Sequence, residues 1–354
     1  MFPYLLFVVV LLFFYYRKNP IMMLLTLVAF AVLRYDVGWD YMSYYGFSSD
    51  EGSLALARER YSVVWYWLFE TAHSLKMPHL GIAVPAVLTS VAVYLSVRMF
   101  CEKDEAAMSD SLLVYALWPF FYLGSFSTIR QSLAVALGLL IFALLYKRRW
   151  IWALVVCLFN LLIHPSSLLI LAYLPLALIP RRIPILVALL LFGGVVMALQ
   201  NWLEIIVLMD VDSFNEYAET YMDQEDQWGR MLSWLLGIIA IYLLVIAWWD
   251  KGQSVWINKL LMVVAIAMAV DTYIYLSDLP SVITRTISYF TIFLVFVFYK
   301  SLRDFPYPKL FRTLLTCALV CLFFIYLDRV SRQEAMLQVS TSSGFAPYKT
   351  ILMK

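Results

Sequence analysis

The chain has 354 residues, of which 64% are hydrophobic and 14% charged, and its formal net charge is +2. A soluble domain is about 45–50% apolar and about 25% charged, so this composition excludes a chain of ordinary soluble domains. Lipid is the solvent that suits these side chains. We therefore expect an all-α, polytopic transmembrane helical bundle that forms a single integral membrane domain over 1–354.

Apolar runs follow one another along the chain with short polar joints. At about 20 residues per crossing, the chain has room for about twelve spans. Segment 61–75 ends at a break formed by Lys76 and Pro78, and we expect it to be a half-inserted or surface helix. Segments 35–60 and 209–229 are predicted as external loops and 328–354 as an external C-terminal tail. The apolar runs are 2–16, 20–34, 61–75, 79–98, 110–124, 128–146, 150–164, 166–180, 184–208, 230–249, 256–277, 282–300 and 310–327.

The basic loops predict the orientation, because cytoplasmic loops are enriched in Lys and Arg. The strongest anchors are Lys147-Arg148-Arg149 and Arg181-Arg182. Placing both inside puts both termini outside, provided that 61–75 does not cross the membrane. A full crossing by 61–75 would instead leave Arg98 and Lys103 outside, and the sequence keeps that alternative open.

Arginine is the more frequent basic residue on the side that this topology places outside. Basic residues are disfavoured there, so another demand is expected to retain them. Arg stays charged in an apolar site and grips phosphate oxygens with a planar fork. A snorkelling side chain beside a lipid phosphate is the alternative for any one of them, whereas a convergent anion site explains the set. The arginines at or within helix ends are Arg34, Arg130, Arg230 and Arg285.

Two segments supply candidate binding groups on the same side. Segment 34–45 combines carboxylates with aromatic rings, which suits sugars because sugars present both apolar faces and hydroxyl groups. Segment 127–134 opens a helix, where Ser127 or Thr128 is expected to cap and the helix N-terminus attracts anions. The candidates from these segments are Asp36, Asp40, Tyr41, Tyr44, Tyr45, Arg130 and Gln131.

Later parts of the chain add fewer candidates. His164 lies at the predicted tip of a helical hairpin, where a hydrogen-bonded structural role is the alternative to catalysis. Ser281, Arg285, Ser288 and Tyr289 share one helix face by their spacing. The sequence holds no nucleotide-binding or metal-binding motif, and we expect no cofactor and no metal.

The order and spacing of these motifs resemble the EpsG-like branch of the Wzy-type polysaccharide polymerases. The resemblance covers most of the chain and includes a Pro165 between His164 and Ser166 where many members carry another residue. The motifs are Arg34-x-x-x-Gly38-x-Asp40-Tyr41-x-x-Tyr44, Ile129-Arg130-Gln131-x-x-Ala134, His164-x-Ser166, a late Arg285 and a C-terminal Pro347-Tyr348-Lys349.

The resemblance implies a GT-C-like, metal-independent glycosyltransferase of the bacterial inner membrane with its active site facing the periplasm. Such an enzyme joins O-antigen or exopolysaccharide repeat units, and both donor and acceptor are oligosaccharides on undecaprenyl pyrophosphate. A chain-length regulator is a possible protein partner, and nucleic acid is not expected. On this interpretation Arg130 and Arg285 hold the pyrophosphate, with Arg34 or Arg230 as a further contact.

The remaining roles follow from the same interpretation. A general base must deprotonate the acceptor hydroxyl, and the sequence leaves His164, Asp40 and Asp36 open. The groups expected to contact substrate are Gln131, Tyr41, Tyr44, Tyr45, Ser288, Tyr289, Tyr348 and Lys349, the last two brought back by the tail.

Two other functions stay open. An O-antigen ligase would use the same donor with a lipid A-core acceptor and would not lengthen chains. A transporter or flippase of an anionic or lipid-linked solute would need charged residues at mid-membrane, for which Asp271 is one of few candidates.

Overall fold

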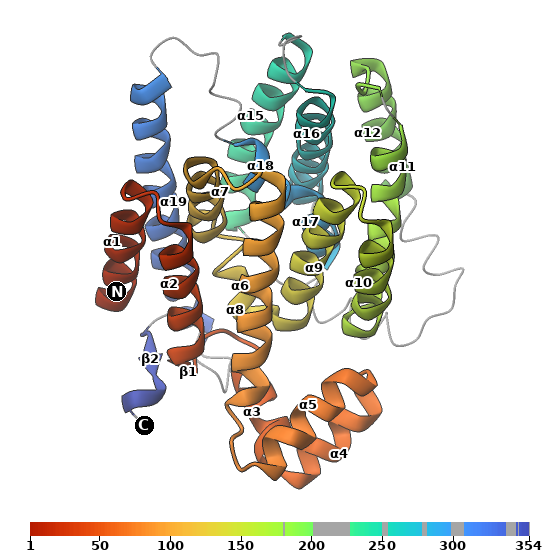
Figure 1. Cartoon of the computed structure of the whole chain (residues 1–354). Coiled ribbons are helices and arrows are strands. Elements are labelled where there is room, and N and C mark those ends of the chain that lie inside the picture. Colours follow the sequence, from red (N-terminus) through yellow and green to blue (C-terminus); the bar gives the residue numbers. More distant parts are fainter. Residues whose placement is uncertain are drawn as a thin grey trace. The chain divides into compact units, whose positions relative to one another are not determined.

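A computed structural model describes residues 1–179, 181–200, 227–249, 254–277, 282–298, 308–337, 345 and 347–353, without the side chains of 200, 227–233, 282–283, 308, 332–337 and 353. The described chain is all-α apart from one short strand pair (Figure 1). It divides into two compact units, unit 1 (Met1–Tyr173 and Leu302–Lys354) and unit 2 (Leu174–Ser301). The expectation of one integral membrane domain stays a prediction.

The elements of unit 1 begin with a hairpin of two apolar helices. Proline opens both of these helices, at a position where a missing N–H costs nothing. In chain order the elements are α1 (Phe2–Tyr16), α2 (Pro20–Leu33), β1 (Arg34–Tyr35), α3 (Tyr41–Ser49), α4 (Glu51–Arg60), α5 (Val63–Ser74), α6 (Leu80–Phe100), α7 (Glu105–Leu117), α8 (Gly124–Ser127), α9 (Ile129–Tyr146), α10 (Trp150–Ile163), the 3-10 helix η1 (Pro165–Ala172), α19 (Pro308–Leu337), β2 (Lys349–Thr350) and the 3-10 helix η3 (Ile351–Met353).

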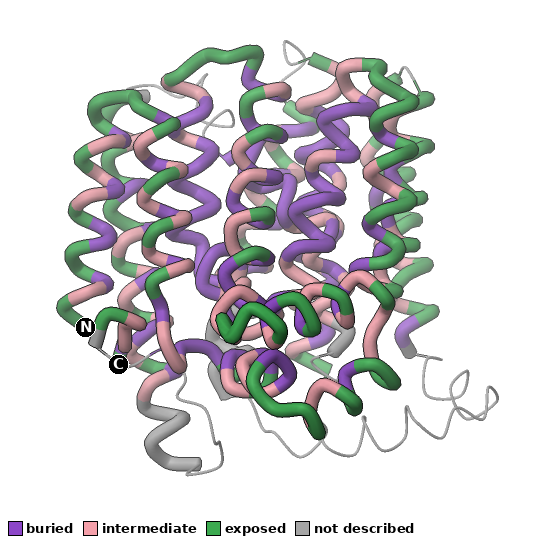
Figure 2. Tube along the Cα trace, turned by 60° about the horizontal axis from the view of Figure 1, so that its bottom comes forward, coloured by how far each residue is buried: buried purple, intermediate pink, exposed green. Residues whose placement is uncertain are grey.

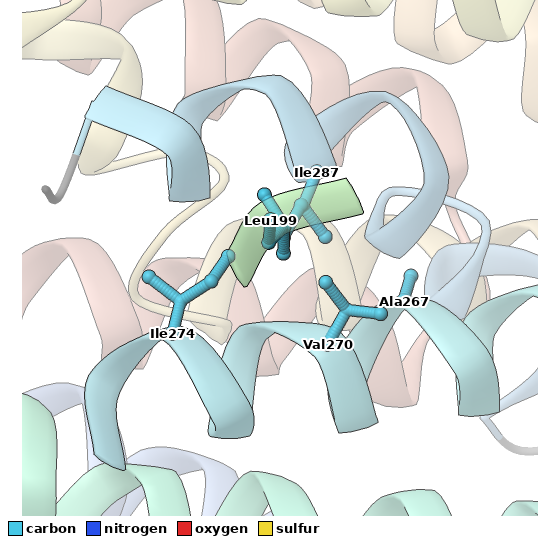
Figure 3. Close-up of a cluster of buried hydrophobic side chains, with 5 residues drawn as sticks. All are labelled: Leu199, Ala267, Val270, Ile274 and Ile287. Carbon is cyan, nitrogen blue, oxygen red and sulfur yellow. The ribbon is translucent and has the colours of Figure 1, made fainter. Parts of the chain in front are cut away.

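Unit 2 contains α12 (Ile185–Gln200), α15 (Gln227–Trp249), α16 (Val255–Leu276), α17 (Val282–Thr291) and α18 (Leu294–Val297), and α11 (Tyr173–Leu178) runs into it from unit 1. A small core joins three of these helices (Figure 3). It consists of Leu199 from α12, Ala267, Val270 and Ile274 from α16, and Ile287 from α17.

The helices combine apolar composition with apolar exposed faces, which suits a lipid environment. α6, α9, α16 and the span Lys309–Ser331 of α19 are long and apolar enough to cross a membrane, and several shorter apolar helices accompany them. The tube of α1, which begins at the label N in Figure 2, alternates between buried and exposed residues. Its exposed positions are themselves apolar, as in Leu5 at 50% and Val9 at 54%, and Ile151 of α10 is 78% exposed. Water would penalise such faces and hydrocarbon does not, so the chain is a multi-pass membrane protein.

Segment 35–60, expected as an external loop, contains two helices. Segment 35–60 contains α3 and α4, because the Asp50 side chain caps α4 by accepting from the Ser53 N–H at 2.7 Å. α5 has 12 residues, fewer than the roughly 17 that a crossing needs. It packs with α3 and α4 at one end of unit 1 (Figure 1), and its place as a half-inserted or surface helix stays a prediction.

The expected spans 110–124, 166–180 and 282–300 are not continuous α-helices. In segment 110–124, α7 ends at Leu117 and the chain turns before α8 begins at Gly124. Segment 166–180 begins as η1 and continues as α11, because the chain turns at His164-Pro165 and restarts as a 3-10 helix. Segment 282–300 is interrupted by a turn at 292–293 between α17 and α18. The predicted loop 209–229 lies almost wholly outside the described residues.

Candidate functional site

The motifs of unit 1 meet at the end of the unit where α2 stops and α9 starts. β1 pairs antiparallel with β2, with Arg34 opposite Thr350 and Tyr35 opposite Lys349. The C-terminal segment therefore returns beside the 34–45 segment (Figure 1). The rings of Tyr4 and Phe30, 5.4 Å apart, bring the start of α1 to the same end.

Arg34 is a buried cation at this end. Its side chain is 1% exposed, and its guanidinium carbon lies 4.1 Å from the centre of the Phe126 ring. Its Nε and Nη1 atoms have no hydrogen-bond partner among the described residues. Burial lowers its pKa to about 10, so the group is still charged at neutral pH. A buried charge without a paired carboxylate is costly, and an anion bound there would offset that cost.

The loop after Arg34 requires a glycine at position 38. Its φ is +96°, and a Cβ on it would lie 2.2 Å from the carbonyl oxygen of Phe126. The Trp39 N–H donates to Ser127 Oγ at 3.2 Å. The loop is thus fastened directly onto α8, which carries the ring beneath Arg34.

Arg130 is held by two tyrosines at the start of α9. Its Nε donates to the Tyr44 hydroxyl at 2.9 Å, and its guanidinium carbon lies 4.2 Å from the centre of the Tyr61 ring. Burial raises the pKa of Tyr44, so this hydroxyl stays neutral and can accept from the cation. Tyr44 is 3% exposed and packs edge-on against Trp65 at 5.8 Å.

The expected cap of α9 is absent. Thr128 is the N-cap residue but makes no side-chain cap hydrogen bond. Its hydroxyl donates to Gly124 O at 3.0 Å, and Ser127 Oγ accepts from Trp39 instead. The prediction that Ser127 or Thr128 caps this helix was wrong, because both hydroxyls fasten neighbouring segments. The first turn of α9, with Arg130 in it, keeps its positive end without a side-chain cap.

The C-terminal segment brings Tyr348 and Lys349 beside α2 and the 34–45 segment, and their expected contact with substrate stays a prediction. The Tyr348 ring stacks on Phe30 at 4.3 Å, and its hydroxyl donates to the Phe30 carbonyl. Lys349 Nζ lies 2.6 Å from Asp36 Oδ2. Asp36, with a φ of +51°, turns the chain at this point.

Tyr41 and Tyr45 differ in their surroundings. Tyr41 is fully buried, and its hydroxyl lies 2.9 Å from His79 Nδ1. His79 Nε2 lies 2.5 Å from the Val32 carbonyl, and since a carbonyl only accepts, Nε2 carries the proton. Tyr45, by contrast, is half-buried and lines a pocket.

His164 caps η1 in the structure. Its Nδ1 accepts from the Ser166 N–H at 3.2 Å and lies 2.7 Å from Ser166 Oγ. The preceding carbonyl of Ile163 accepts from the Trp65 indole at 2.9 Å. His-x-Ser is therefore a local capping motif, joined through Trp65 to the tyrosine that holds Arg130. A role for His164 in proton transfer stays a prediction.

Other candidates are placed only in part. Gln131 is half-buried in the first turn of α9. Asp40 acts electrostatically on the buried Tyr44 and raises its pKa. In unit 2, Arg285 and Ser288 are half-buried on α17 and Tyr289 is fully buried. The Arg230 side chain lies outside the described residues. Convergence of Arg285 or Arg230 with Arg130 stays a prediction.

The sequence reasoning missed some residues of this end. Phe126 beneath Arg34 and Trp65 beside Tyr44 look like ordinary apolar positions, and no signal in the sequence separates them from core residues. His79 offered a weak signal, because it follows the break at Pro78 and precedes an apolar helix. Tyr35 stood within the aromatic 34–45 segment, between Arg34 and Asp36.

Comparison with known proteins gives one match. No curated protein and no solved structure matched the chain. The model of the EpsG family matches residues 19–350, a range that includes the motifs brought together in unit 1 as well as Arg285. The chain belongs to the EpsG family.

Proposed function

We propose that the protein is a polysaccharide polymerase that joins repeat units carried on undecaprenyl pyrophosphate. Membership of the EpsG family indicates a role in polysaccharide biosynthesis. The observation that carries the finer proposal is the meeting of Arg34, Arg130 and the tail residues Tyr348 and Lys349 at one end of unit 1.

The chemistry needs positive charge at the leaving group. When the glycosidic bond to the pyrophosphate breaks, negative charge grows on the phosphate oxygens, and fixed cations there lower the barrier. Arg130 is oriented by Tyr44 and Tyr61, and lies at the uncapped start of α9. Arg34 supplies a second cation that has no carboxylate partner among the described residues. Arg285 joins this set in the proposal.

The acceptor hydroxyl must lose a proton as the new bond forms. Asp36 forms an ion pair with Lys349, and His164 Nδ1 accepts from a backbone N–H. Asp40 acts electrostatically on Tyr44 and Tyr61, the two tyrosines that hold Arg130, and on that ground it is the base that we favour. Asp40 precedes α3, and its backbone carbonyl accepts from the Tyr44 N–H at 3.1 Å, which supports a base close to the residue that holds Arg130.

The charges of unit 1 favour an outward-facing site. α2 ends and α6 and α9 begin at the site end, so the loops after α1, α6 and α9 lie at the opposite end. Those loops carry Arg17, Lys18, Lys103 and Lys147-Arg148-Arg149, and Lys147 Nζ pairs with Glu102 at 2.6 Å. Basic loops stay in the cytoplasm, so the proposed site faces the periplasm. A GT-C-like bundle of about twelve spans belongs to the same proposal.

The test is the polysaccharide ladder from cells that lack the gene, complemented with wild type, Arg130→Ala or Arg130→Lys. We expect single repeats in the deletion, a ladder with wild type, and none with Arg130→Ala at equal protein in the membrane. Arg130→Lys should restore little, since lysine cannot reproduce the planar fork. An unchanged ladder in the deletion would refute the proposal. Lipid-linked polymer that accumulates without transfer to core would indicate a ligase.

A further inference from the structure

A pocket of about 250 Å³ opens beside the buried arginine of unit 1. It is smaller than the roughly 300–1,000 Å³ clefts that hold drug-sized ligands, so it suits one unit of a larger substrate. Its lining comes from β1, α3, the joint between α5 and α6, and η3. The lining residues are Tyr35, Tyr45, Lys76, Met77, Pro78, His79, Leu80 and Ile351.

The strand explains how this pocket relates to Arg34. Successive side chains of a strand point to opposite faces. Arg34 points inward onto Phe126, whereas Tyr35 lines the pocket. The backbone of β1 therefore separates a buried cation from an open aromatic pocket; β2 pairs with β1, and Ile351 of η3 lines the pocket.

The tyrosines of this region divide by exposure into those that serve the protein and those that can serve a ligand. Tyr41 and Tyr44 are buried and hydrogen-bonded to His79 and Arg130. Tyr35 and Tyr45 remain half-buried, with ring centres 6.0 Å apart at an interplanar angle of 89°. An edge-to-face pair of this kind offers an aromatic face beside hydroxyl groups, which matches the mixed surface of a sugar ring.

The charge of the pocket lining favours an anionic ligand. Both His79 ring nitrogens are engaged within the protein, Nε2 with the Val32 carbonyl and Nδ1 with the Tyr41 hydroxyl. Lys76 is the charged side chain among the residues that line the pocket, and no carboxylate is among them. A ring that carries a carboxylate or another anionic group is the sugar that this wall suits.

We propose that this pocket binds one acidic sugar ring of the lipid-linked saccharide, which contacts the Tyr35 and Tyr45 side chains and pairs its anionic group with Lys76. The assignment rests on the proposed polymerase function and adds a subsite to it. The pocket and Arg34 lie on opposite faces of β1, which pairs with β2 of the C-terminal segment. A sugar ring bound in the pocket therefore places the rest of the saccharide beside the proposed pyrophosphate site.

The experiment uses the same deletion cells, complemented with pocket variants of the full chain. Tyr45→Ala and Tyr35→Ala remove a ring, and Tyr45→Phe keeps it. Lys76→Gln removes the charge, and Lys76→Arg keeps it. Trp67→Ala is the matched control, because Trp67 on α5 is 62% exposed and does not line the pocket. Ladder length and the amount of membrane-inserted protein are measured for each variant.

We expect Tyr45→Ala, Tyr35→Ala and Lys76→Gln each to weaken saccharide binding roughly threefold to tenfold and to shift the ladder to shorter chains at unchanged protein level. Tyr45→Phe, Lys76→Arg and Trp67→Ala should keep the wild-type ladder. If Arg130→Ala abolishes the ladder while Tyr45→Ala and Tyr35→Ala leave it unchanged, the subsite is refuted and the polymerase stands. If Lys76→Gln alone has no effect, the acidic preference is refuted. A ladder that does not depend on the gene refutes the polymerase function itself.

Discussion

The hydrogen bond from Arg130 to Tyr44 gives the sharpest test of the site. Tyr44→Phe removes the one oxygen that accepts from Arg130 Nε at 2.9 Å and keeps the ring that packs on Trp65 and Phe69. The aromatic packing therefore persists, and the change is confined to the orientation of one guanidinium group.

The expected size follows from the charge of the donor. A hydrogen bond to a charged group contributes about 1.5–3 kcal/mol, which corresponds to roughly 10- to 150-fold in rate if all of it acts in the transition state. The Tyr61 ring, 4.2 Å from the same guanidinium carbon, still holds Arg130. We therefore expect the lower end, a rate of chain extension reduced about tenfold.

The assay is initial-rate extension of purified lipid-linked repeat units by the protein in proteoliposomes. Tyr66→Phe is the matched control, because it removes a hydroxyl that donates to Glu70 at 3.2 Å on the exposed side of α5. It should leave the rate unchanged. The same Tyr44→Phe change is then made in an Arg130→Lys background to form a double-mutant cycle.

The cycle separates two explanations. If Tyr44 acts through the orientation of Arg130, its removal should cost little further rate once lysine stands at position 130. Equal losses of rate in both backgrounds would show that Tyr44 acts independently of Arg130. A wild-type rate for Tyr44→Phe would refute the reasoning altogether.

Two further predictions concern stability. Gly38→Ala should destabilise the folded protein by roughly 2–4 kcal/mol, because Gly38 has a φ of +96° and an added Cβ would lie 2.2 Å from Phe126 O. Thermal unfolding in detergent measures this loss of stability. Gly194→Ala is the control and should show no loss, since nothing lies within 4 Å of a Cβ added there. Arg34→Met should leave the unfolding temperature unchanged or raise it, since it removes a buried charge that lacks partners for Nε and Nη1, while the ladder is lost. A large fall in unfolding temperature would show that Arg34 is structural, and a normal ladder would remove it from the site.

The pKa of Arg34 gives the sign of the pH effect behind the second prediction. Burial lowers it to about 10, below its ordinary value, so the folded state disfavours the charged form. The destabilising contribution is fully present below about pH 10 and is relieved as the pH rises from there toward the ordinary pKa of arginine. At neutral pH the cost is therefore present, and Arg34→Met removes it.

The sequence by itself determined the class of the protein. Composition and hydropathy depend on the sum over many residues, so a multi-pass helical membrane protein follows from them without any contact map. The family also followed from the sequence, because the motifs that contain Gly38, Arg130 and His164 occur in the order and at the spacing typical of that family. The break at Lys76–Pro78 indicated a surface segment, and α5 is short and packs with α3 and α4.

Only the tertiary structure decided which of these residues contact one another. A hydroxyl at Tyr44 and another at Tyr41 are equivalent in the sequence, yet one accepts from Arg130 and the other is bonded to His79. The pairing of β1 with β2 joins residues separated by most of the chain, and no local pattern encodes such a partner. Hydropathy and periodicity are short-range properties, whereas hydrogen-bond partners and the burial of Arg34 depend on how distant segments pack.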